Sequence, residues 1–167
     1  MPVDSRLPVV PSVGAAACEA WGASTSPSLA QRQCDQFAEP CSERQPALFL
    51  DRDGVVIEDG HHLSDPDQVK LCPGAKQLIE TAHRAHWPVV IVTNQSGIAR
   101  GLFSWDAYRQ VNARMLQLLG PAAPLAAIYA SGDGPEPPAD TWRKPSPGML
   151  LEAELSLIHI SEPTRRY

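Results

Sequence analysis

The sequence predicts an α/β fold, a Rossmann-like doubly wound parallel sheet. Apolar strand-like runs alternate along the chain with segments of helical periodicity, in the order β-α-β-α-β-α. This alternation is typical of parallel sheets with right-handed crossovers. Each strand-like run also ends in polar residues, and in such sheets ligands bind where the carboxyl ends of the strands meet. The 167 residues are the length of one domain, and a hydrophobic fraction of 43% is ordinary for a globular protein.

The N-terminal residues 1–45 carry no helical or strand period and are rich in Pro, Ser, Ala, Gly and Gln. A segment of this composition buries too little apolar surface to offset the entropy lost on ordering. We expect a disordered extension, or sequence upstream of the true start. A small N-terminal subdomain is the alternative, but Trp21 and Phe37 are its only large aromatic residues, and a small core needs more.

Three strands are expected in the remainder of the chain. The first, at 47–51, is a short apolar run that leads into a turn signal at Gly54. The second, at 88–92, is a continuous β-branched run and fits a parallel strand buried on both faces. The third and weakest is expected at 125–129. The connection over 54–73 is long for a compact domain, and such loops are usually functional.

The helices are marked by their ends and by the spacing of their apolar residues. The first is expected over 73–86, where apolar residues keep the i, i+3, i+4, i+7 spacing of one buried face. The second follows Ser104, a residue type that caps helix N-termini, and ends at Gly120. The third is expected over 146–154, where a serine and a proline open the first turn.

Two carboxylates, Asp51 and Asp53, directly follow the first strand. Buried charge costs free energy unless it is paired or coordinates a metal. Side chains at i and i+2 of a strand point the same way, although Gly54 indicates that the chain already turns at Asp53. One acid is suited to act as nucleophile or metal ligand while the other handles protons. The alternative is a surface turn, because Asp-Gly is a common turn dipeptide.

Two further polar clusters, Thr93-Asn94 and Arg143-Lys144, follow the other two strands. At one edge of a parallel sheet they would join the two carboxylates. Two acids, a hydroxyl with an amide, and two cations fit a phosphate site with a nucleophile. Taken alone, Thr93-Asn94 fits a helix cap better than a phosphate site, and Arg143-Lys144 alone would usually be a surface cation pair.

The residue types in these clusters suggest individual roles. Asp51 is expected to attack phosphorus and form an aspartyl-phosphate, while Asp53 protonates the leaving oxygen and then deprotonates water. Thr93 and the amides after it would hold phosphate oxygens. Lys144 would neutralise charge on the transferring phosphoryl group. A Mg²⁺ ion would offset the repulsion between Asp51 and a phosphate.

This ordered set resembles the haloacid-dehalogenase (HAD) phosphatases, subfamily IIIA. Asp51-Arg52-Asp53-Gly54 is similar to their first motif, Val92-Thr93-Asn94 to the second and Arg143-Lys144-Pro145 to the third. The stretches 93–101 and 143–149 are similar to those of the D-glycero-D-manno-heptose 1,7-bisphosphate phosphatases, with the histidinol-phosphatases as near neighbours. The resemblance covers about 47–154 and implies the HAD fold with a minimal cap.

The resemblance also implies an activity, the Mg²⁺-dependent hydrolysis of a sugar phosphate, with heptose bisphosphate as the closest match. It implies that Asp51 is nucleophile and metal ligand, and that Asp53 is proton donor and binds the metal through its carbonyl. Thr93 and Lys144 are implied to act on the phosphoryl group. The implied substrate contacts are Arg52, Asp59, Gly60, His61, His62, Asn94, Gln95, Ser96 and Arg143. From the residues alone, His61-His62 fits a solvated loop pair better than a metal site.

Two departures from the family pattern affect the expected metals. Relatives often hold a structural zinc with Cys and His in the loop before the third motif, but residues 130–142 contain neither, so zinc is not expected. The family's fourth motif supplies acidic metal ligands, and here no aspartate follows Asp140. We therefore expect weak Mg²⁺ binding, and a sheet that is incomplete on its C-terminal side and leaves apolar surface exposed.

The expected organisation has three parts. Residues 1–45 are the extension, and residues 46–154 form a partial HAD-like phosphatase core. From Leu155 the sequence stops tracking the family, and residues 155–167 resemble a tail produced by sequencing-adapter read-through. This tail is expected to be an artefact and is excluded from fold reasoning.

Composition excludes several classes of partner. The formal net charge of −5, with charges well mixed, argues against a nucleic-acid-binding surface, which needs a basic patch. No apolar run approaches the ~18 residues of a membrane span, and no signal-peptide pattern opens the chain. The four cysteines have no regular spacing and fit free thiols in a reducing cytoplasm. We expect a cytoplasmic monomer that acts on a small phosphorylated sugar.

Other functions are consistent with the same residues. Within the phosphatases, histidinol phosphate or a polynucleotide 3′-phosphate is an alternative substrate. A signalling receiver domain also presents an aspartate at a strand end of a doubly wound sheet, although Asp53 together with Arg143-Lys144 fits hydrolysis better. The chain as written also fits an inactive fragment of such a phosphatase.

Overall fold

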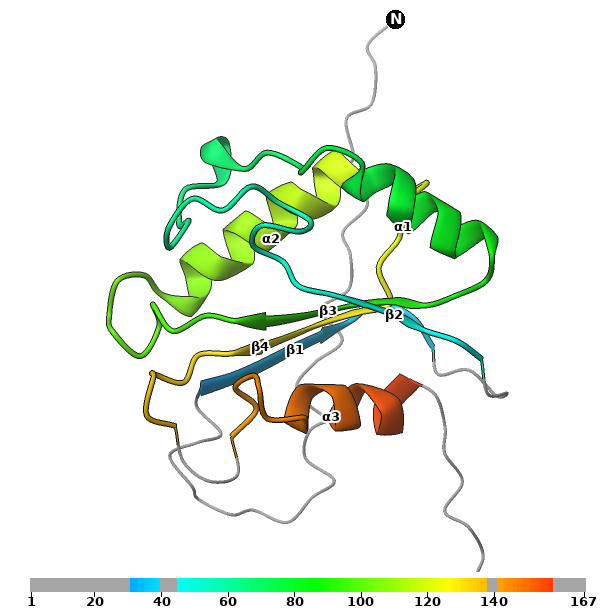
Figure 1. The fold of residues 1–167 in the computed structure, drawn as a ribbon. Helices are drawn as coiled ribbons and strands as arrows, with labels where there is room; N and C mark the ends of the chain where they lie inside the picture. The colour runs from blue at the N-terminus through cyan, green and yellow to red at the C-terminus, as the bar shows by residue number, and fades with distance from the viewer. Residues whose placement is uncertain (1–30, 40–44, 138–140, 158–167) are drawn as a thin grey trace, which may run out of the picture.

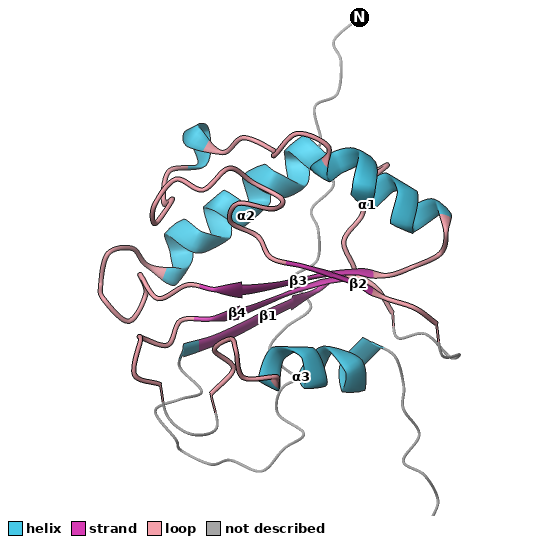
Figure 2. Cartoon of the chain, in the orientation of Figure 1, coloured by secondary structure: helices cyan, strands magenta, loops and turns pink. Residues whose placement is uncertain are grey.

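The computed structural model describes residues 31–39, 45–137 and 141–157. A four-stranded sheet in the order β1-β4-β3-β2 forms the middle layer. Two helices, α1 (Ala75–Arg84) and α2 (Trp105–Leu119), cover one face, and α3 (Gly148–Leu157) covers the other (Figures 1 and 2). Three of the strands run parallel: β2 (Leu48–Leu50), β3 (Val89–Asn94) and β4 (Ala127–Ser131). The predicted doubly wound α/β class is confirmed.

The register of the parallel strands aligns their carboxyl ends. Leu50 pairs with Ile91, so the chain leaves β2 at Asp51 while β3 continues for three more residues. Asn94, the last residue of β3, pairs with Ser131, the last residue of β4. Polar residues that follow β2, β3 and β4 are therefore delivered to the same edge of the sheet, as the sequence predicted.

The fourth strand, β1 (Arg32–Gln36), corrects one expectation. Residues 1–45 were expected to lack regular structure, but Arg32–Gln36 pairs antiparallel with β4. The reason is that the edge strand gains its order from backbone pairing with β4, whereas its sequence Arg-Gln-Cys-Asp-Gln has no apolar alternation to signal a strand. The tail was expected to begin at Leu155, but residues 155–157 complete α3 and Leu157 is buried against the sheet, so that boundary is wrong. Residues 1–30, 40–44 and 158–167 lie outside the described residues.

The buried core is divided by the sheet into two clusters. Val89 and Ile91 of β3 pack under α1 and α2, whereas Val90 and Val92 face α3. This alternation follows from the two-residue period of a strand and explains why β3 reads as one continuous apolar run. On the outer side of α3, three leucines are exposed: Leu150, Leu151 and Leu155. None of the described helices is both long and apolar enough to cross a membrane.

The helix ends agree with the sequence signals. The Ser104 hydroxyl accepts a hydrogen bond from the main-chain N–H of Ala107, which caps α2. At the other end Gly120 takes a positive φ of 70°, a conformation that glycine adopts without steric cost. The expected buried stripe of the first helix included Leu78 and Ala85, but Leu78 is 45% exposed, and Ala85 is exposed and follows the last residue of α1. The buried stripe is therefore narrower than predicted.

The connection between β2 and α1 is fixed to the core rather than loose. It contains a short 3₁₀ helix, η3 (Pro66–Gln68), which lies over α2 (Figure 1). Gly54 takes a φ of 78°, which turns the chain immediately after Asp53, and its main-chain N–H donates to the Ile57 carbonyl. Val56 and Ile57 then insert into the core with no exposed surface. The loop that follows is thereby held near the end of β2.

On β1, burial raises the pKa of Asp35, outweighing the Gln33 hydrogen bond and the Arg109 charge that favour the carboxylate. A raised pKa in the folded state means that ionisation of Asp35 opposes folding above that pKa.

Asp35→Asn is therefore expected to raise the melting temperature at pH 7 by about 1–2 °C, a small effect because the group is partly solvated. The gain should vanish below pH ~3, where Asp35 is protonated in both states. Thermal denaturation across pH, with Asp67→Asn as a control on an exposed acid, checks this; a lower melting temperature at pH 7 would contradict it.

Candidate active site

Side chains from three strand ends meet at the carboxyl edge of the sheet. Asp51 and Asp53 follow β2, and Thr93 to Gln95 end β3 and begin the next loop. Lys144 arrives from the segment between β4 and α3, and its ammonium lies 2.5 Å from the Asp51 carboxylate. The convergence expected from the sequence is thus present in the structure.

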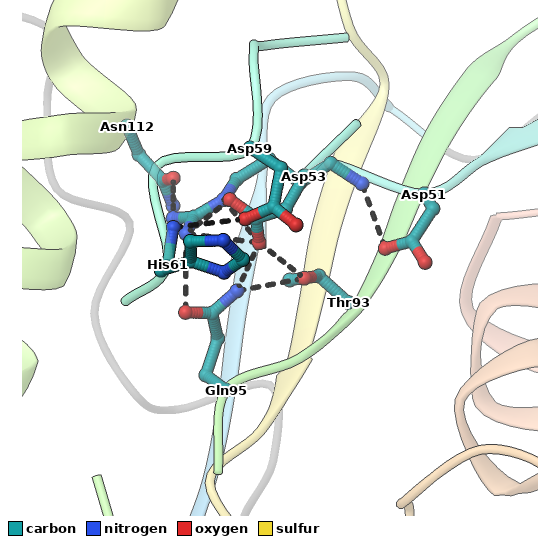
Figure 3. A network of polar contacts seen from close by, with 8 residues as sticks. Asp51, Asp53, Asp59, His61, Thr93, Gln95 and Asn112 are labelled. Carbon is teal, nitrogen blue, oxygen red and sulfur yellow. Dashed lines mark hydrogen bonds and ion pairs between the residues drawn. The ribbon is translucent and has the colours of Figure 1, made fainter. Parts of the chain in front are cut away.

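Asp51 is the outermost of the two acids. Its side chain is 43% exposed, while that of Asp53 is 26% exposed. One Asp51 oxygen, Oδ1, accepts a hydrogen bond from the main-chain N–H of Arg52 at 2.8 Å, and Oδ2 accepts from the Lys144 ammonium. Figure 3 shows the Asp51 carboxylate apart from the cluster around Asp53. An oriented and accessible carboxylate beside a cation is suited to nucleophilic attack on an anion.

Lys144 is held by the end of β3. The Asn94 side-chain amide donates to the Lys144 carbonyl at 3.1 Å and accepts from the Lys144 main-chain N–H at 2.9 Å. The Lys144 ammonium donates to the Val92 carbonyl at 3.0 Å as well as to Asp51. Asn94 was expected to contact substrate, and it also borders the neighbouring cavity, but its two hydrogen bonds to the backbone position Lys144.

Asp53 lies at the centre of a polar cluster (Figure 3). The Arg52 guanidinium donates to both of its carboxylate oxygens at 3.0–3.3 Å. Gln95 Nε2 donates to Asp53 Oδ2 at 2.7 Å, and the buried Thr93 hydroxyl is 3.4 Å from the same oxygen. Arg52 was expected to contact substrate; it borders the neighbouring cavity, but its side chain is only 1% exposed and its charge is directed at Asp53.

A cavity of about 230 Å³ opens beside this cluster. The loop after β2 borders it on one side and the loop after β3 on the other; the lining residues are Arg52, Asp53, Asp59, His61, His62, Leu63, Asn94, Gln95 and Ser96. Gly60 belongs to the same loop, and the His61 main-chain N–H donates to Asp59. The backbone of His61 and of His62 has a positive φ, at 47° and 69°, a conformation that residues other than glycine seldom adopt. The predicted substrate loop therefore lies at a polar cavity next to Asp53.

Arg143 does not contact Asp51 or Asp53, but the neighbouring loop fixes its position. Its Nη1 donates to the Asp133 carbonyl at 3.1 Å, and its main-chain N–H donates to the Thr141 hydroxyl at 2.8 Å. The buried Asp133 carboxylate in turn accepts from the hydroxyls of Ser131 and Thr141. These hydrogen bonds among Ser131, Asp133, Thr141 and Arg143 hold together the described part of the loop between β4 and Lys144, where no zinc site was expected.

Oxygen donors for a hard cation are present near Asp51. The exposed Asp51 carboxylate and the Asp53 main-chain carbonyl are the ligand type that Mg²⁺ prefers. Within residues 31–39, 45–137 and 141–157, no three His, Cys, Asp or Glu side chains gather as a metal site. Mg²⁺ commonly keeps several waters and takes one or two protein carboxylates plus substrate phosphate, so the donors present fit that mode.

A larger cavity, of about 460 Å³, lies at the opposite end of the sheet. It is bordered mainly by apolar and aromatic residues, among them Phe37, Trp87 and Leu125. Neither acid of the β2 end nor Lys144 borders it. The smaller cavity is the candidate active site because Asp53 and the amides of Asn94 and Gln95 border it, and Asp51 lies close to Asp53 on the chain.

The loop after β3 is closely packed at Gly97. A Cβ at Gly97 would lie 2.2 Å from Cε1 of Phe103, whose ring is 6.2 Å from the His62 ring. Gly97→Ala is therefore expected to displace Phe103 and to lower the free energy of unfolding by about 1–3 kcal/mol. Denaturant titration measures this loss. Gly134→Ala is the control, because its added Cβ would meet Ala99 at 3.7 Å, an ordinary contact; equal losses in the two variants would contradict the expected crowding.

Comparison with curated proteins finds heptose phosphatases. The chain is 49% identical over 115 residues to the D-glycero-beta-D-manno-heptose-1,7-bisphosphate 7-phosphatase of Mesorhizobium japonicum, covering 65% of this chain and 53% of the relative. It is 36% identical over 116 residues to the enzyme of the same name from Rhodopseudomonas palustris, covering 65% of this chain and 64% of the relative. The chain thus spans about half to two thirds of the length of these relatives.

Solved structures have the same fold. A structure described as a HAD-like phosphatase from Mesorhizobium loti superposes with a TM-score of 0.69 at 41% identity, covering 76% of this chain and 65% of its own. The D,D-heptose 1,7-bisphosphate phosphatase of B. bronchiseptica, solved with magnesium and phosphate, gives a TM-score of 0.61 at 35% identity. The match covers 66% of this chain and 63% of that structure's chain. The family model described as polynucleotide kinase 3 phosphatase matches residues 50–164. With this match over most of its length, the chain belongs to the polynucleotide kinase 3 phosphatase family of HAD-like phosphatases.

Proposed function

We propose that the chain carries the catalytic core of a Mg²⁺-dependent phosphatase that hydrolyses a sugar phosphate, D-glycero-D-manno-heptose 1,7-bisphosphate. One observation carries this proposal: the exposed Asp51 carboxylate lies 2.5 Å from the Lys144 ammonium, next to the buried cluster that holds Asp53. The names of the relatives support the choice of sugar.

The reaction divides into two displacements at phosphorus. An Asp51 oxygen attacks the phosphorus of the monoester, and the bond from phosphorus to the sugar oxygen breaks. Asp53, protonated, gives its proton to that oxygen, so the sugar leaves as an alcohol. A water molecule then attacks the phosphorus of the aspartyl-phosphate while Asp53 takes up one of its protons. Inorganic phosphate leaves, and the Asp51 carboxylate is regenerated.

The cationic and N–H groups near Asp51 would stabilise the phosphoryl group during both steps. Lys144 is positioned to bind a phosphoryl oxygen while staying near Asp51, because Asn94 fixes its backbone. Such preoriented charge lowers the barrier without reorganisation at the moment of reaction. Mg²⁺, held by the Asp51 carboxylate and the Asp53 carbonyl, would supply charge neutralisation between nucleophile and phosphate.

The cavity beside Asp53 would take the sugar. Its lining includes the Asp59 carboxylate, two imidazoles and the Ser96 hydroxyl, groups that hydrogen-bond to sugar hydroxyls. Arg143, fixed by Asp133 and Thr141, would recognise the substrate from the segment before α3. The net charge of −5 disfavours a polynucleotide in this place, because nucleic-acid binding depends on neutralising phosphates with cations.

Phosphate release from matched substrates tests the proposal. The 167-residue chain, with Mg²⁺, is offered both anomers of heptose 1,7-bisphosphate, histidinol phosphate and a 3′-phosphorylated oligonucleotide. The heptose bisphosphate is expected to give the highest kcat/KM, and EDTA is expected to remove the activity. Faster hydrolysis of histidinol phosphate or of the oligonucleotide would overturn the substrate, and absence of release from all four would overturn the activity of this chain.

A further inference from the structure

Arg52 is a buried cation within the active site. Its side chain is 1% exposed, and it is among the largest fully buried side chains of the described residues. Burying a guanidinium is costly unless it is paired and hydrogen-bonded with good geometry. The Arg52 guanidinium is surrounded by partners on three sides: the Asp53 carboxylate, the Asn112 amide and the Tyr108 ring. These contacts fix its position relative to Asp53.

The first side is the carboxylate of Asp53. The Arg52 Nε and Nη2 groups both donate to it, which is the two-pronged geometry that fixes a carboxylate in orientation as well as in distance. Gln95 closes a ring with the same pair. Its Oε1 accepts from Arg52 Nη2 at 3.1 Å, and its Nε2 donates to Asp53 Oδ2 at 2.7 Å. A guanidinium only donates, so the Gln95 amide has one orientation that satisfies both neighbours.

The other two sides come from α2, which lies behind Arg52. Asn112 Oδ1 accepts from Arg52 Nη1 at 3.0 Å, and the Tyr108 ring lies 5.0 Å from the guanidinium carbon. Tyr108 and Asn112 are four residues apart, so they occupy one face of the helix. Both are buried, and burial raises the pKa of Tyr108, which keeps its ring neutral. Neither residue borders the cavity, so they reach Asp53 only through Arg52.

We propose that Arg52, supported by Asn112 and Tyr108, is a positioning residue that holds the Asp53 carboxylate in the orientation for proton transfer. The proposal deepens the proposed function and rests on its assignment of Asp53 as the group that transfers the proton. The chain of contacts runs from α2 through the guanidinium to the carboxylate. The buried Arg52 guanidinium thus acts on the reaction through the Asp53 carboxylate, which is the group that contacts the substrate.

Steady-state kinetics of Asn112→Leu test the proposal. This substitution removes the acceptor for Arg52 Nη1 at a residue that does not line the cavity. The expected result is a fall in kcat of about tenfold to a hundredfold with KM changed less than twofold, as small misplacement of a reacting group has this effect. Asn112→Asp, which keeps an oxygen acceptor at the same place, is expected to restore most of the lost kcat. Val111→Ala is the matched control, since it removes buried volume from the same helix turn.

A second measurement needs no activity. In the ¹⁵N spectrum of the Arg52 guanidinium, assigned with Arg52→Lys, the Nη groups are expected to rotate slowly because Asp53, Gln95 and Asn112 hold them. Asn112→Leu and Asp53→Asn should each speed this rotation, and Val111→Ala should not. This result separates the positioning network from the proposed function if the chain hydrolyses none of the substrates.

Three outcomes would overturn the positioning role. One is a freely rotating Arg52 guanidinium in the unaltered chain. Another is a kcat loss in Val111→Ala equal to that in Asn112→Leu, which would mean that the effect is general loss of packing. The third is a rise in KM with kcat unchanged in Asn112→Leu, which would place Arg52 in substrate binding.

Discussion

Asparagine in place of Asp51 is expected to lower the rate of phosphate release by at least about a thousandfold. The Asp51 carboxylate is 43% exposed at the end of β2 and is oriented by the Arg52 N–H and the Lys144 ammonium. An amide of the same size keeps the shape of the site but lacks the charge and nucleophilicity to form the aspartyl-phosphate. Rapid-quench detection of the phosphorylated enzyme, together with steady-state phosphate release, measures both consequences.

The matched control for Asp51 is Asp106→Asn. Asp106 also pairs with a cation, Arg109, but on the exposed surface of α2. Asp51 and Lys144 form a partly exposed ion pair and Asp106 and Arg109 an exposed one, so both substitutions should change the free energy of unfolding by about 1 kcal/mol or less. Only Asp51→Asn should lose activity. A phosphorylated enzyme in Asp51→Asn would show that another residue is the nucleophile.

The sheet that carries this site was predicted from the sequence mainly because its central strands, β3 and β4, are buried on both faces, whereas β2 at the edge is half-buried. Burial selects continuous apolar runs, and the runs at 47–51 and 88–92 fall on β2 and β3. The predicted strand at 125–129 is displaced, since β4 runs Ala127–Ser131. Its last residues, Ala130 and Ser131, are buried in the structure but are weak strand formers, so propensity alone ended the strand too early.

The β1 edge strand escaped prediction for a different reason. Its side chains are only half-buried, and its order comes from pairing with β4, about a hundred residues further along the chain. A local pattern cannot report such a pairing, because the hydrogen bonds involve backbone atoms that every residue possesses. A strand at a sheet edge also tolerates the polar sequence Arg-Gln-Cys-Asp-Gln.

The positions of candidate site residues were predicted where they follow strand ends, and the contacts made from helix α2 were missed. Asp51, Thr93 and Lys144 follow strands, so topology alone brings them to one edge. Asn112 and Tyr108 lie within α2, and Tyr108 reads as one more apolar residue of the buried stripe. A polar residue four positions later on that same face, Asn112, was the available signal, because buried amides require a partner.

Methionine in place of Lys144 is expected to lower kcat by about 10²–10³-fold. The substitution keeps most of the side-chain length but removes the ammonium that lies 2.5 Å from Asp51 and 3.0 Å from the Val92 carbonyl. Because Asn94 holds the backbone at this position, the site should keep its shape. The loss should therefore appear in kcat, where the charge stabilises the transferring phosphoryl group, with a smaller change in KM.

Lys76→Met separates this effect from the general loss of a lysine. The Lys76 ammonium also donates to a carbonyl, that of Leu118, but it joins α1 to the end of α2, away from the carboxyl edge of the sheet. Full steady-state curves for both variants, with heptose bisphosphate as substrate, make the comparison. Lys76→Met should retain the kcat of the unaltered chain. If Lys144→Met changed KM alone, the ammonium would bind the ground state and the transition state equally, and its charge would not be what lowers the barrier.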